Sequence, residues 1–320
     1  MEKHQMVEEY LRGLGYALRQ PQGLYAPVDY VLQEGGKRLR PVLCLMACEL
    51  FGGDEKAALP VAAGLEVFHN FTLLHDDIMD NADMRRGKPT VHKVWDSNTA
   101  ILSGDAMLIE AYKLVSKAPA ALLSEVTGIF STTATGVCEG QQYDMDFERR
   151  DVVALSEYIE MIRLKTAVLL AGALKIGAVL AGASDEDCRR LYDYGINLGI
   201  AFQLRDDYLD TFGNPEVFGK KLGGDISCGK KNYLLTKAFE ILPPHDMAEL
   251  KKWMEIDGRD EEKISAVTGI YRRNGIGKLC EDAVSEYCDK ALSALSAVEG
   301  NVNSTGELAA LVAKLQTRQV

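Results

Sequence analysis

Two long apolar segments of this chain each end in the pattern Asp-Asp-x-x-Asp, which restricts the folds available to it. In the first segment, apolar side chains recur at steps of three and four residues from Phe68 to Ile78, which is helical spacing. On such a helix Asp76 and Asp80 lie one turn apart on one face, at the helix end that disfavours anions. A divalent cation would remove this repulsion, and an all-oxygen ligand set favours Mg²⁺ or Mn²⁺ over zinc.

The second segment ends in Asp206, Asp207 and Asp210, again after an apolar helical run. One such cluster alone is about as often a solvated helix end as a ligand site. Two clusters are a stronger signal, because Mg²⁺ keeps several waters and is held by one or two carboxylates plus substrate phosphates. We therefore expect two acidic helix ends that face each other and hold a polyphosphate through metal ions.

Helical spacing continues along most of the chain. We predict helices at 2–20, 27–34, 41–51, from 54 or 60 into the first acidic cluster, 99–117, 120–147, 156–182, 185–212, 230–241, 246–256, 260–274, 276–298 and 305–318. Ser184 and Ser304 each begin a capping-box pattern, and 213–229 is predicted to be a long mobile loop. No alternating apolar and polar run of strand length is bounded by hairpin turns, so we predict an all-α fold. No linker stands out, and we predict one domain over residues 1–320.

Composition narrows the class of partner. With 36 Lys and Arg against 47 Asp and Glu, the net charge is −11, whereas a nucleic-acid-binding protein needs a broad basic face. The seven cysteines include no Cys-x-x-Cys and mostly fall in apolar helical patterns, so we expect reduced, buried thiols in a cytoplasmic protein. The longest apolar run, 167–182, is interrupted by Lys175 and is too short to span a bilayer, so we expect no stable membrane insertion.

Basic side chains accompany both acidic clusters. They are Lys37, Arg38 and Arg40 in an early glycine-flanked segment, Arg85 and Arg86 after the first cluster, and Lys220, Lys221, Lys230 and Lys231 after the second. For Arg38 or Lys221 alone, a solvated surface charge is the better interpretation. Lys165 is harder to explain that way, because it lies in the middle of an apolar helix and lysine is seldom buried without a partner. Arg and Lys suit phosphate contacts, and no P-loop or Rossmann pattern supports a nucleotide-binding fold.

The helices between the acidic ends also predict an apolar interior. Its candidate residues are Phe68, Phe71, Leu74, Leu102 and Met107. Charged groups above an apolar cavity favour an amphiphilic substrate with a diphosphate head and a hydrocarbon tail, although Phe68 and Phe71 fit an ordinary core about equally well. His69, taken alone on an apolar helix, is more often a structural hydrogen-bonding residue, and local spacing suggests no Ser/His/Asp or Cys/His set.

These motifs resemble those of the trans-prenyltransferases of the polyprenyl synthetase family, the farnesyl and geranylgeranyl diphosphate synthases. They occur in family order as Gly-Gly-Lys-Arg-Leu-Arg-Pro at 35–41, the first aspartate motif with Arg-Arg-Gly, Gly-Gln-Gln-Tyr-Asp at 140–144, Lys165-Thr166, Phe-Gln-Leu-Arg-Asp-Asp-Tyr-Leu-Asp at 202–210 and Phe-Gly-Lys-Lys-Leu-Gly-Gly-Asp at 218–225. The resemblance covers roughly residues 35–290. It implies an isoprenoid-synthase-type helical bundle with a central apolar cavity, in a cytoplasmic homodimer.

The resemblance also implies a role for each matching residue. Asp76, Asp80 and Asp206 would ligate Mg²⁺, three ions per site with Mn²⁺ able to substitute, and Asp77, Asp207 and Asp210 would support them. The allylic diphosphate would be held by Arg85, Lys165, Thr166, Gln203, Lys220 and Lys230, of which Lys165 would also take part in catalysis. Isopentenyl diphosphate would be held by Lys37, Arg40, His69 and Arg86.

The implied reaction is ionisation of the allylic diphosphate, condensation with isopentenyl diphosphate and loss of a proton. Positive charge stabilises the leaving diphosphate, and an apolar cavity protects the allylic cation from water, so no general-base side chain is needed. In the family the fifth residue before the first motif faces down the cavity; here it is Phe71, followed by Thr72, with Phe68 one turn deeper. These rings predict a short product, farnesyl (C15) or geranylgeranyl (C20), with a slight preference for C20.

The alternatives are a medium- or long-chain polyprenyl diphosphate synthase and a non-catalytic partner subunit of such an enzyme. A partner subunit would be expected to have lost one acidic motif, and both are present. A terpene cyclase or a squalene-type synthase is disfavoured because the second motif and the isopentenyl diphosphate residues are present together.

Overall fold

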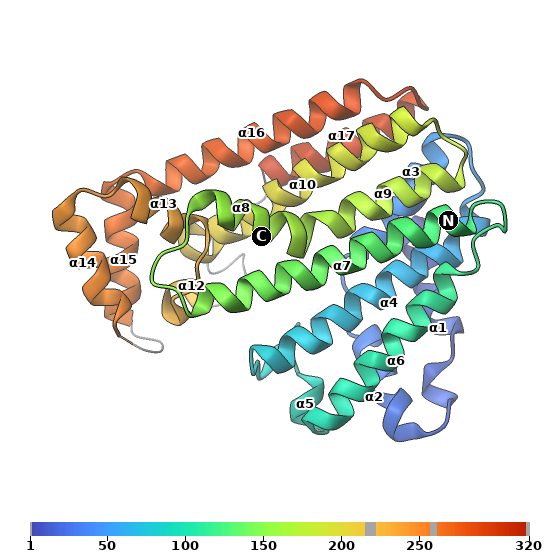
Figure 1. Cartoon of the computed structure of the whole chain (residues 1–320), viewed down its shortest axis with the longest axis horizontal. Helices are drawn as coiled ribbons and strands as arrows, with labels where there is room; N and C mark the ends of the chain where they lie inside the picture. The colour runs from blue at the N-terminus through green and yellow to red at the C-terminus, as the bar shows by residue number, and fades with distance from the viewer. Residues whose placement is uncertain (1, 215–221, 257–260, 318–320) are drawn as a thin grey trace. The chain divides into compact units, whose positions relative to one another are not determined.

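The computed structural model describes residues 2–214, 222–256 and 261–317, which are mostly helical (Figure 1). The all-α prediction is confirmed. The chain divides into two compact units: unit 1 is Met1–Thr132, Gly172–Leu191 and Glu299–Ser304, and unit 2 is Thr133–Ala171, Tyr192–Val298 and Thr305–Val320. The prediction of one domain over residues 1–320 stays a prediction.

Unit 1 is built around helix α4, which carries the first aspartate motif. Its elements are α1 Lys3–Gly13, the 3₁₀ turn Tyr16–Leu18, α2 Gln22–Gln33, α3 Leu39–Leu50, α4 Glu55–Met79, the hairpin of β1 Met84–Arg85 and β2 Lys88–Pro89, α5 Val91–Val94, α6 Ser97–Val115 and the first part of α7 Leu123–Glu148, together with the helical residues within 172–191 and 299–304. Helix α4 packs against α6, α3 and α1 (Figure 1). The Asp54 side chain caps its start by accepting a hydrogen bond from the Lys56 N–H at 2.9 Å.

Unit 2 carries the second aspartate motif on α10. Its elements are the rest of α7, α8 Leu155–Ile162, the π-helical segment Arg163–Ala167, the start of α9 Val168–Leu180, most of α10 Asp185–Phe212, α12 Gly224–Cys228, α13 Tyr233–Ile241, α14 Pro244–Met254, α15 Glu261–Arg273, α16 Ile276–Ser296 and most of α17 Val302–Gln316. The π-helical segment lies against two glycines. A Cβ atom at Gly140 on α7 would come 2.2 Å from the backbone nitrogen of Lys165, and a Cβ atom at Gly199 on α10 would come 2.5 Å from the Cα atom of Ala167.

Several predicted helix ends are confirmed and others are wrong. The Ser184 side chain caps the start of α10 as predicted, because the Asp187 N–H donates to the Ser184 hydroxyl at 3.1 Å, and that hydroxyl in turn donates to the Asp187 carboxylate at 2.8 Å. The prediction of one helix over 2–20 is wrong, because α1 ends at Gly13 and Gly15 adopts a left-handed conformation with φ 65°. Helix α17 starts at Val302, two residues before Ser304.

Three further differences concern helices that the sequence places differently or omits. Helix α2 starts at Gln22 and contains Pro27, which the sequence predicts as the first residue of a helix. The predicted loop 213–229 contains α12, and residues 215–221 lie outside the described residues. The sequence also predicts no strand, whereas the two-residue strands β1 and β2 pair with each other.

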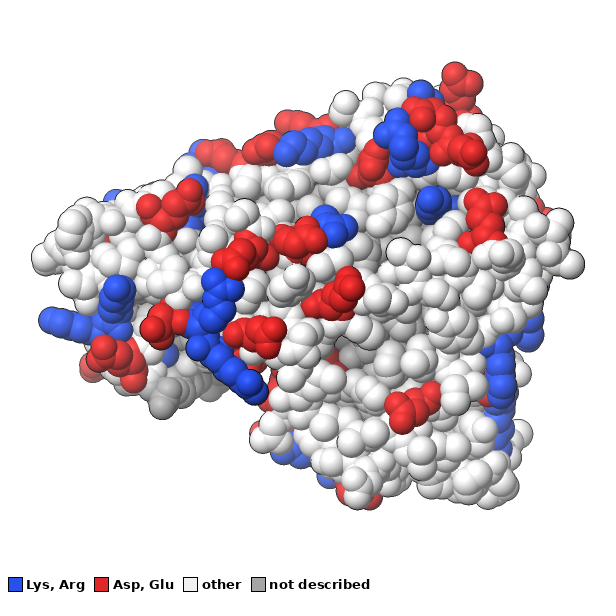
Figure 2. All heavy atoms as spheres, in the orientation of Figure 1, with Lys and Arg blue, Asp and Glu red and all other residues white. Residues whose placement is uncertain are grey.

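Burial matches the expectations for cysteine and for the apolar helices. All seven cysteines are free thiols, and all except Cys138 and Cys228 are buried. Within the described part of the chain, α4 is the one helix long and apolar enough to cross a bilayer, and 67% of its most apolar window is buried, as in the core helix of a globular protein. On the face drawn in Figure 2, acidic and basic side chains form small interspersed groups.

Candidate active site

The first aspartate motif lies at the C-terminal end of α4. Asp76 and Asp77 fall in its last turn, and Asp80 caps the helix with its N–H donating to the Asp76 carbonyl at 2.9 Å. The Arg85 guanidinium donates to the Asp77 carboxylate at 2.8 Å and to the Asp76 carboxylate at 3.3 Å. Burial raises the pKa of Asp77, against the opposing charge of Arg85. Asp77 is buried, Asp76 is half-buried and Asp80 is exposed, so the outer two aspartates are the more accessible ones.

The residues predicted to bind isopentenyl diphosphate lie in unit 1. The Arg40 guanidinium on α3 is 3.1 Å from the His69 Nε2 atom on α4. Burial, with the charges of Arg40 and Arg86, lowers the pKa of His69 well below its usual value, so the ring is neutral and accepts this hydrogen bond. Arg86 donates to the Gly35 carbonyl, and Lys37 is exposed on the same segment as Gly35.

Arg40 has a property suited to binding an anion. Burial lowers its pKa to about 10, which still leaves the guanidinium protonated at neutral pH. Its Nε atom is buried and has no hydrogen-bond partner among the described residues. A buried, unsatisfied donor on a charged group is costly, and an oxygen atom of a bound anion would satisfy it.

Arg38 is a structural residue, and the interpretation as a solvated charge is wrong. Its side chain is fully buried and donates to the carboxylates of Glu8 at 2.7 Å and Glu66 at 2.8 Å, and to the Leu32 carbonyl. Its backbone has φ 43°, a left-handed conformation that is uncommon for a residue other than glycine. The segment between Lys37 and Arg40 is therefore anchored through Arg38 to α1 and α4.

The residues predicted to limit product length also lie on α4. Phe71 and Phe68 are buried with ring centroids 5.6 Å apart, and the Phe68 ring lies 5.3 Å from that of Phe130 on α7. The Thr72 hydroxyl donates to the His69 carbonyl at 2.7 Å, so it is bonded to the backbone of its own helix.

One residue predicted for the apolar interior is exposed. Leu74 and Met107 are buried, but Leu102 has 60% of its surface exposed, so its assignment to the interior is wrong. Five residues correspond to about 140° of rotation around a helix, so Leu102 and Met107 occupy different faces of α6.

In unit 2, Lys165 and Thr166 lie on the π-helical segment. The Lys165 ammonium pairs with the Asp144 carboxylate on α7 at 2.5 Å, and the Thr166 hydroxyl donates to the Gln203 side chain on α10 at 3.3 Å. Burial alone would raise the pKa of Asp144, but the charges of Lys165 and Lys230 outweigh burial and lower it. π-Helical turns are often found at functional sites, because they change the direction of the side chains they carry.

The second aspartate motif is more crowded than the first. Asp207 is buried and accepts hydrogen bonds from the Tyr158 hydroxyl, the Tyr233 N–H at 2.9 Å and the Gln203 side chain at 3.2 Å. Burial and the nearby Asp225 carboxylate raise the pKa of Asp207 to about 7.

The other two aspartates of this motif are half-buried. Asp210 accepts a hydrogen bond from the Asp225 N–H at 3.0 Å, and burial with the Asp225 charge raises its pKa to about 6. Asp206 lies on the same turn of α10.

Lys230 is exposed, and its positive charge acts on both Asp144 and Asp210. It lines a small cavity of about 40 Å³ together with Asp144, Tyr158, Met161, Ile162, Lys165, Thr166, Gln203, Asp207 and Asn232. Lys220, also predicted to bind the allylic diphosphate, lies outside the described residues. Most residues that the sequence assigns to the allylic diphosphate in unit 2 therefore surround one space.

The carboxylates of both motifs fit a divalent cation. The raised pKa values of Asp207 and Asp210 reflect burial and the negative charge that neighbouring carboxylates place around them. A hard cation with oxygen ligands would relieve this repulsion, and carboxylate oxygens are the ligands that Mg²⁺ prefers.

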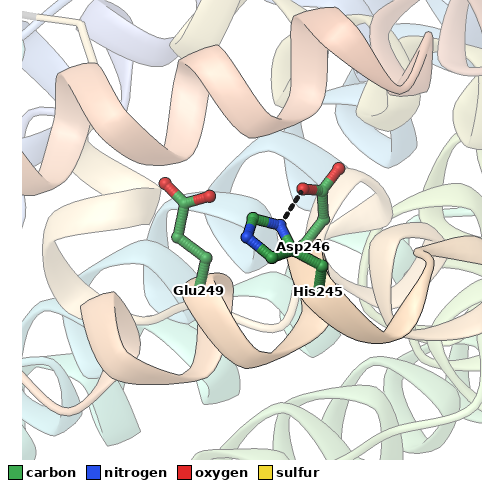
Figure 3. Close-up of side chains that lie close together, drawn as sticks. All are labelled: His245, Asp246 and Glu249. Carbon is green, nitrogen blue, oxygen red and sulfur yellow. Dashed lines mark hydrogen bonds and ion pairs between the residues drawn. The ribbon is translucent and has the colours of Figure 1, made fainter.

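A third acidic group lies apart from the predicted residues, on α14. Figure 3 shows His245, Asp246 and Glu249 close together, with the His245 ring 3.2 Å from the Asp246 carboxylate. The Arg273 guanidinium on α15 donates to Asp246 at 2.9 Å and also to Glu249, and it lowers the pKa of Asp246. We interpret this group as an ion-pair cluster that joins α14 to α15.

Four residues of these sites were missed as site residues by the sequence analysis: Glu66, Asp144, Tyr158 and Asp225. Glu66 is an acidic residue inside an apolar helical run, which is a detectable signal of a buried partner for cations. Asp144 and Asp225 each end a recognised motif, but nothing in the motif identifies their contacts. Tyr158 gives no signal, because a buried tyrosine on an amphipathic helix is an ordinary core residue.

Comparison with known proteins identifies the family of the chain. Residues 21–271 match the polyprenyl synthetase family. The chain is 47% identical over 223 residues to a geranylgeranyl diphosphate synthase of Methanosarcina mazei, covering 69% of this chain and 68% of that protein. It is 41% identical over 239 residues to a geranylfarnesyl diphosphate synthase of Natronomonas pharaonis, covering 69% and 70%.

A solved structure gives the same result. The geranylgeranyl pyrophosphate synthetase of Pyrococcus horikoshii has a TM-score of 0.93 and 32% identity, with 99% of this chain and 96% of that chain covered. The chain therefore belongs to the polyprenyl synthetase family, whose members are magnesium-dependent prenyltransferases that act on isoprenoid diphosphates.

Proposed function

We propose that this enzyme condenses isopentenyl diphosphate with an allylic diphosphate, namely dimethylallyl, geranyl or farnesyl diphosphate, and releases geranylgeranyl diphosphate (C20). The observation that carries the proposal is the buried ring of Phe71, five residues before Asp76 and backed by Phe68. The relative named geranylgeranyl diphosphate synthase at 47% identity supports it. A relative named geranylfarnesyl diphosphate synthase makes a product one isoprene unit longer the nearest alternative.

The proposal gives each unit its own part of the reaction. Asp76 and Asp80 in unit 1 and Asp206 in unit 2 hold Mg²⁺, three ions per site, and Mn²⁺ can replace them. When bound, these ions supply positive charge that stabilises the diphosphate as it leaves. In unit 1, Arg85 is paired with the first motif and available to the allylic diphosphate, while in unit 2 Lys165, Thr166, Gln203, Lys220 and Lys230 bind that same group.

Isopentenyl diphosphate, the second substrate, keeps its diphosphate in the reaction, and side chains of unit 1 bind it. Arg40, with its buried and unsatisfied Nε atom, donates to isopentenyl diphosphate together with Lys37 and Arg86. The neutral His69 ring accepts from Arg40 and fixes the direction of the guanidinium. Condensation needs no general-base side chain, because the departing diphosphate itself accepts the proton that is lost.

A product assay tests the proposal. Purified protein with Mg²⁺ and isopentenyl diphosphate receives each allylic primer separately, and dephosphorylated products are sized by chromatography. We expect C20 as the main product, and Phe71→Ala should lengthen it by at least one C5 unit. Phe239→Ala, a half-buried phenylalanine on α13, is the matched control and should leave product length unchanged.

Other outcomes have definite meanings. A main product of C30 or longer from the unchanged protein would contradict the short-chain proposal and favour a long-chain synthase. Elongation of no primer by folded protein would favour a non-catalytic partner subunit. An unchanged product length in Phe71→Ala would contradict the assignment of Phe71.

The proposal includes a homodimer in the cytoplasm. Helix α6 exposes Ile101, Leu102 and Ile109, with 44%, 60% and 58% of their surfaces accessible, and a second copy of the chain would cover them. Sedimentation equilibrium should give twice the 35.2 kDa chain mass, and Leu102→Asp with Ile109→Asp should give the monomer. Val302→Asp, at a more exposed apolar residue on α17, is the control and should remain dimeric. The seven free thiols support the cytoplasm as the compartment.

A further inference from the structure

The ring of His75 packs directly against the backbone of helix α6 at Gly104, where no side chain occupies the space. A Cβ atom at position 104 would lie 2.2 Å from the His75 Nε2 atom and 2.5 Å from its Cδ2 atom, so only glycine leaves room for the ring in this position. The Nε2 atom is 3.1 Å from the Ile101 carbonyl, and a carbonyl can only accept, so the ring donates this hydrogen bond. His75 is thereby fixed in direction by the backbone of α6.

The seated ring touches the side chain that the proposed function depends on. The centroids of His75 and Phe71 are 4.8 Å apart with the rings at 64°, an edge-to-face contact. On its other side Phe71 meets Phe68 at 5.6 Å. Among the described residues these are the two aromatic contacts of Phe71.

The ring of Phe68 is itself supported from behind. It lies 5.3 Å from Phe130, and Phe130 lies 4.9 Å from Tyr112, whose hydroxyl donates to Ser131 at 3.2 Å. Among the described residues, the aromatic contact of Phe71 toward the start of α4 is therefore with a supported series of rings, and its aromatic contact toward the end of α4 is with His75. The position of Phe71 depends on both.

We propose that His75 is a positioning residue for product length. Its ring, seated at Gly104, holds the Phe71 ring where it ends chain growth. The inference rests on the proposed function, because it concerns the length of the product of that reaction. It gives a role to the histidine beside Asp76 that is separate from metal binding and from substrate contact.

The first experiment compares His75→Ala, Phe71→Ala and the double variant in the product assay. Without the His75 ring, Phe71 can turn aside, and the ratio of longer products to the wild-type product should rise roughly threefold to tenfold, the range expected for loss of one aromatic pair. Because His75 acts through Phe71, the double variant should give the same product length as Phe71→Ala.

The second experiment displaces the ring without removing it. Gly104→Ala places a methyl group where the His75 ring lies, and the ring is the end of a side chain that can rotate away. This variant should also lengthen the product, while Gly104→Ala combined with His75→Ala should match His75→Ala, since the methyl group then meets no ring. Gly269→Ala on α15, where a Cβ atom meets nothing within 4 Å, is the control and should leave product length unchanged.

Product ratios, thermal melting and the Mg²⁺ concentration for half-maximal rate are measured for each variant. A ratio that shifts while melting and Mg²⁺ dependence stay close to wild type supports the inference. Unchanged product length in both His75→Ala and Gly104→Ala overturns it, as does an additive shift in either double variant. If His75→Ala is inactive, Gly104→Ala decides. Failure of the proposed function differs, because the unchanged protein would then make no C20 product.

Discussion

The two aspartate motifs share a pattern but have different surroundings. On α4, Asp77 is paired with Arg85, so its charge is balanced by a cation. On α10, Asp207 accepts three hydrogen bonds and lies near the Asp225 carboxylate, which shares the Asp210 neighbourhood. The same sequence pattern therefore gives one carboxylate stabilised by an ion pair and one stabilised by hydrogen-bond donors.

The difference predicts different protonation of the two motifs. With a pKa of about 7, Asp207 is partly protonated at neutral pH, and Asp210, with a pKa of about 6, is partly protonated just below it. Binding of a divalent cation favours the ionised carboxylates. The motif on α10 should therefore change its charge on cation binding more than the motif on α4.

The largest expected effect is on kcat, and it distinguishes the two aspartate motifs from the acidic group on α14. Asp76→Asn and Asp206→Asn should each lower kcat by about a hundredfold or more, because charge that develops on the leaving diphosphate loses stabilisation. Glu249→Gln alters an acidic residue of the α14 cluster and should leave kcat close to wild type. Steady-state assays with saturating Mg²⁺ measure this. An aspartate variant that keeps a tenth of the wild-type kcat would remove its motif from the proposed site.

A smaller effect distinguishes the buried aspartates of the two motifs. Asp77→Asn removes an ion-pair partner of Arg85, whose side chain is 27% exposed, and should lower the free energy of unfolding by about 1–2 kcal/mol. Asp207→Asn should not lower it, because the amide oxygen keeps the bonds from Tyr158 and Tyr233, the Gln203 amide can flip, and the variant no longer has to ionise a group whose pKa the fold raises to about 7.

Urea unfolding at pH 7.5 without metal measures both changes. If Asp207→Asn is as destabilising as Asp77→Asn, the contrast between the two motifs is wrong. A stabilised Asp77→Asn variant would likewise contradict the role of the pair with Arg85.

A further effect is in the pH dependence of stability. A carboxyl whose pKa is higher in the folded chain than in the unfolded chain binds more protons when folded between those two values. Its contribution to the free energy of unfolding therefore falls as pH rises from about 4 to about 7, the window set by the usual value of 3.8 and the raised value of Asp207.

Asp207→Asn removes this dependence. The stability of the variant relative to the wild type should rise from pH 4 to pH 7 and then level off, as measured by urea unfolding with a chelator at several pH values. A constant difference across this range would show that Asp207 ionises as an ordinary carboxyl.

Much of the helical fold was predictable from local signals. The helix over 185–212 was predicted to the residue, because Ser184 and Asp187 mark its start and the apolar period continues to its end. Arg38 could not be placed correctly, because its partners Glu8 and Glu66 lie 30 and 28 residues away and no local pattern pairs them. The assignment of Leu102 to the apolar interior was wrong for a similar reason. The spacing of apolar residues shows that a helix has an apolar face, but it does not show which part of the helix other elements cover.

The residue types of the candidate site could be predicted from the sequence, but their protonation states could not. Motif order predicts the aspartates and the cations as candidate site residues, but the raised pKa of Asp207 depends on Asp225, which follows it by 18 positions and approaches only in the fold. The contact of His75 with Gly104 is equally invisible in the sequence, because each residue is ordinary for a helix.

The π-helical segment has a consequence for how this region can change over generations. It holds one residue more than the α-helical turn it replaces, so side chains before and after it differ by about 100° from a regular helix. Deleting that residue would restore a regular helix but turn Lys165 and Thr166 to a new direction, and a side chain at Gly140 or Gly199 would collide with its backbone. The extra residue and the two glycines therefore constrain one another, and we expect that a change in any one of them alone would disturb this segment.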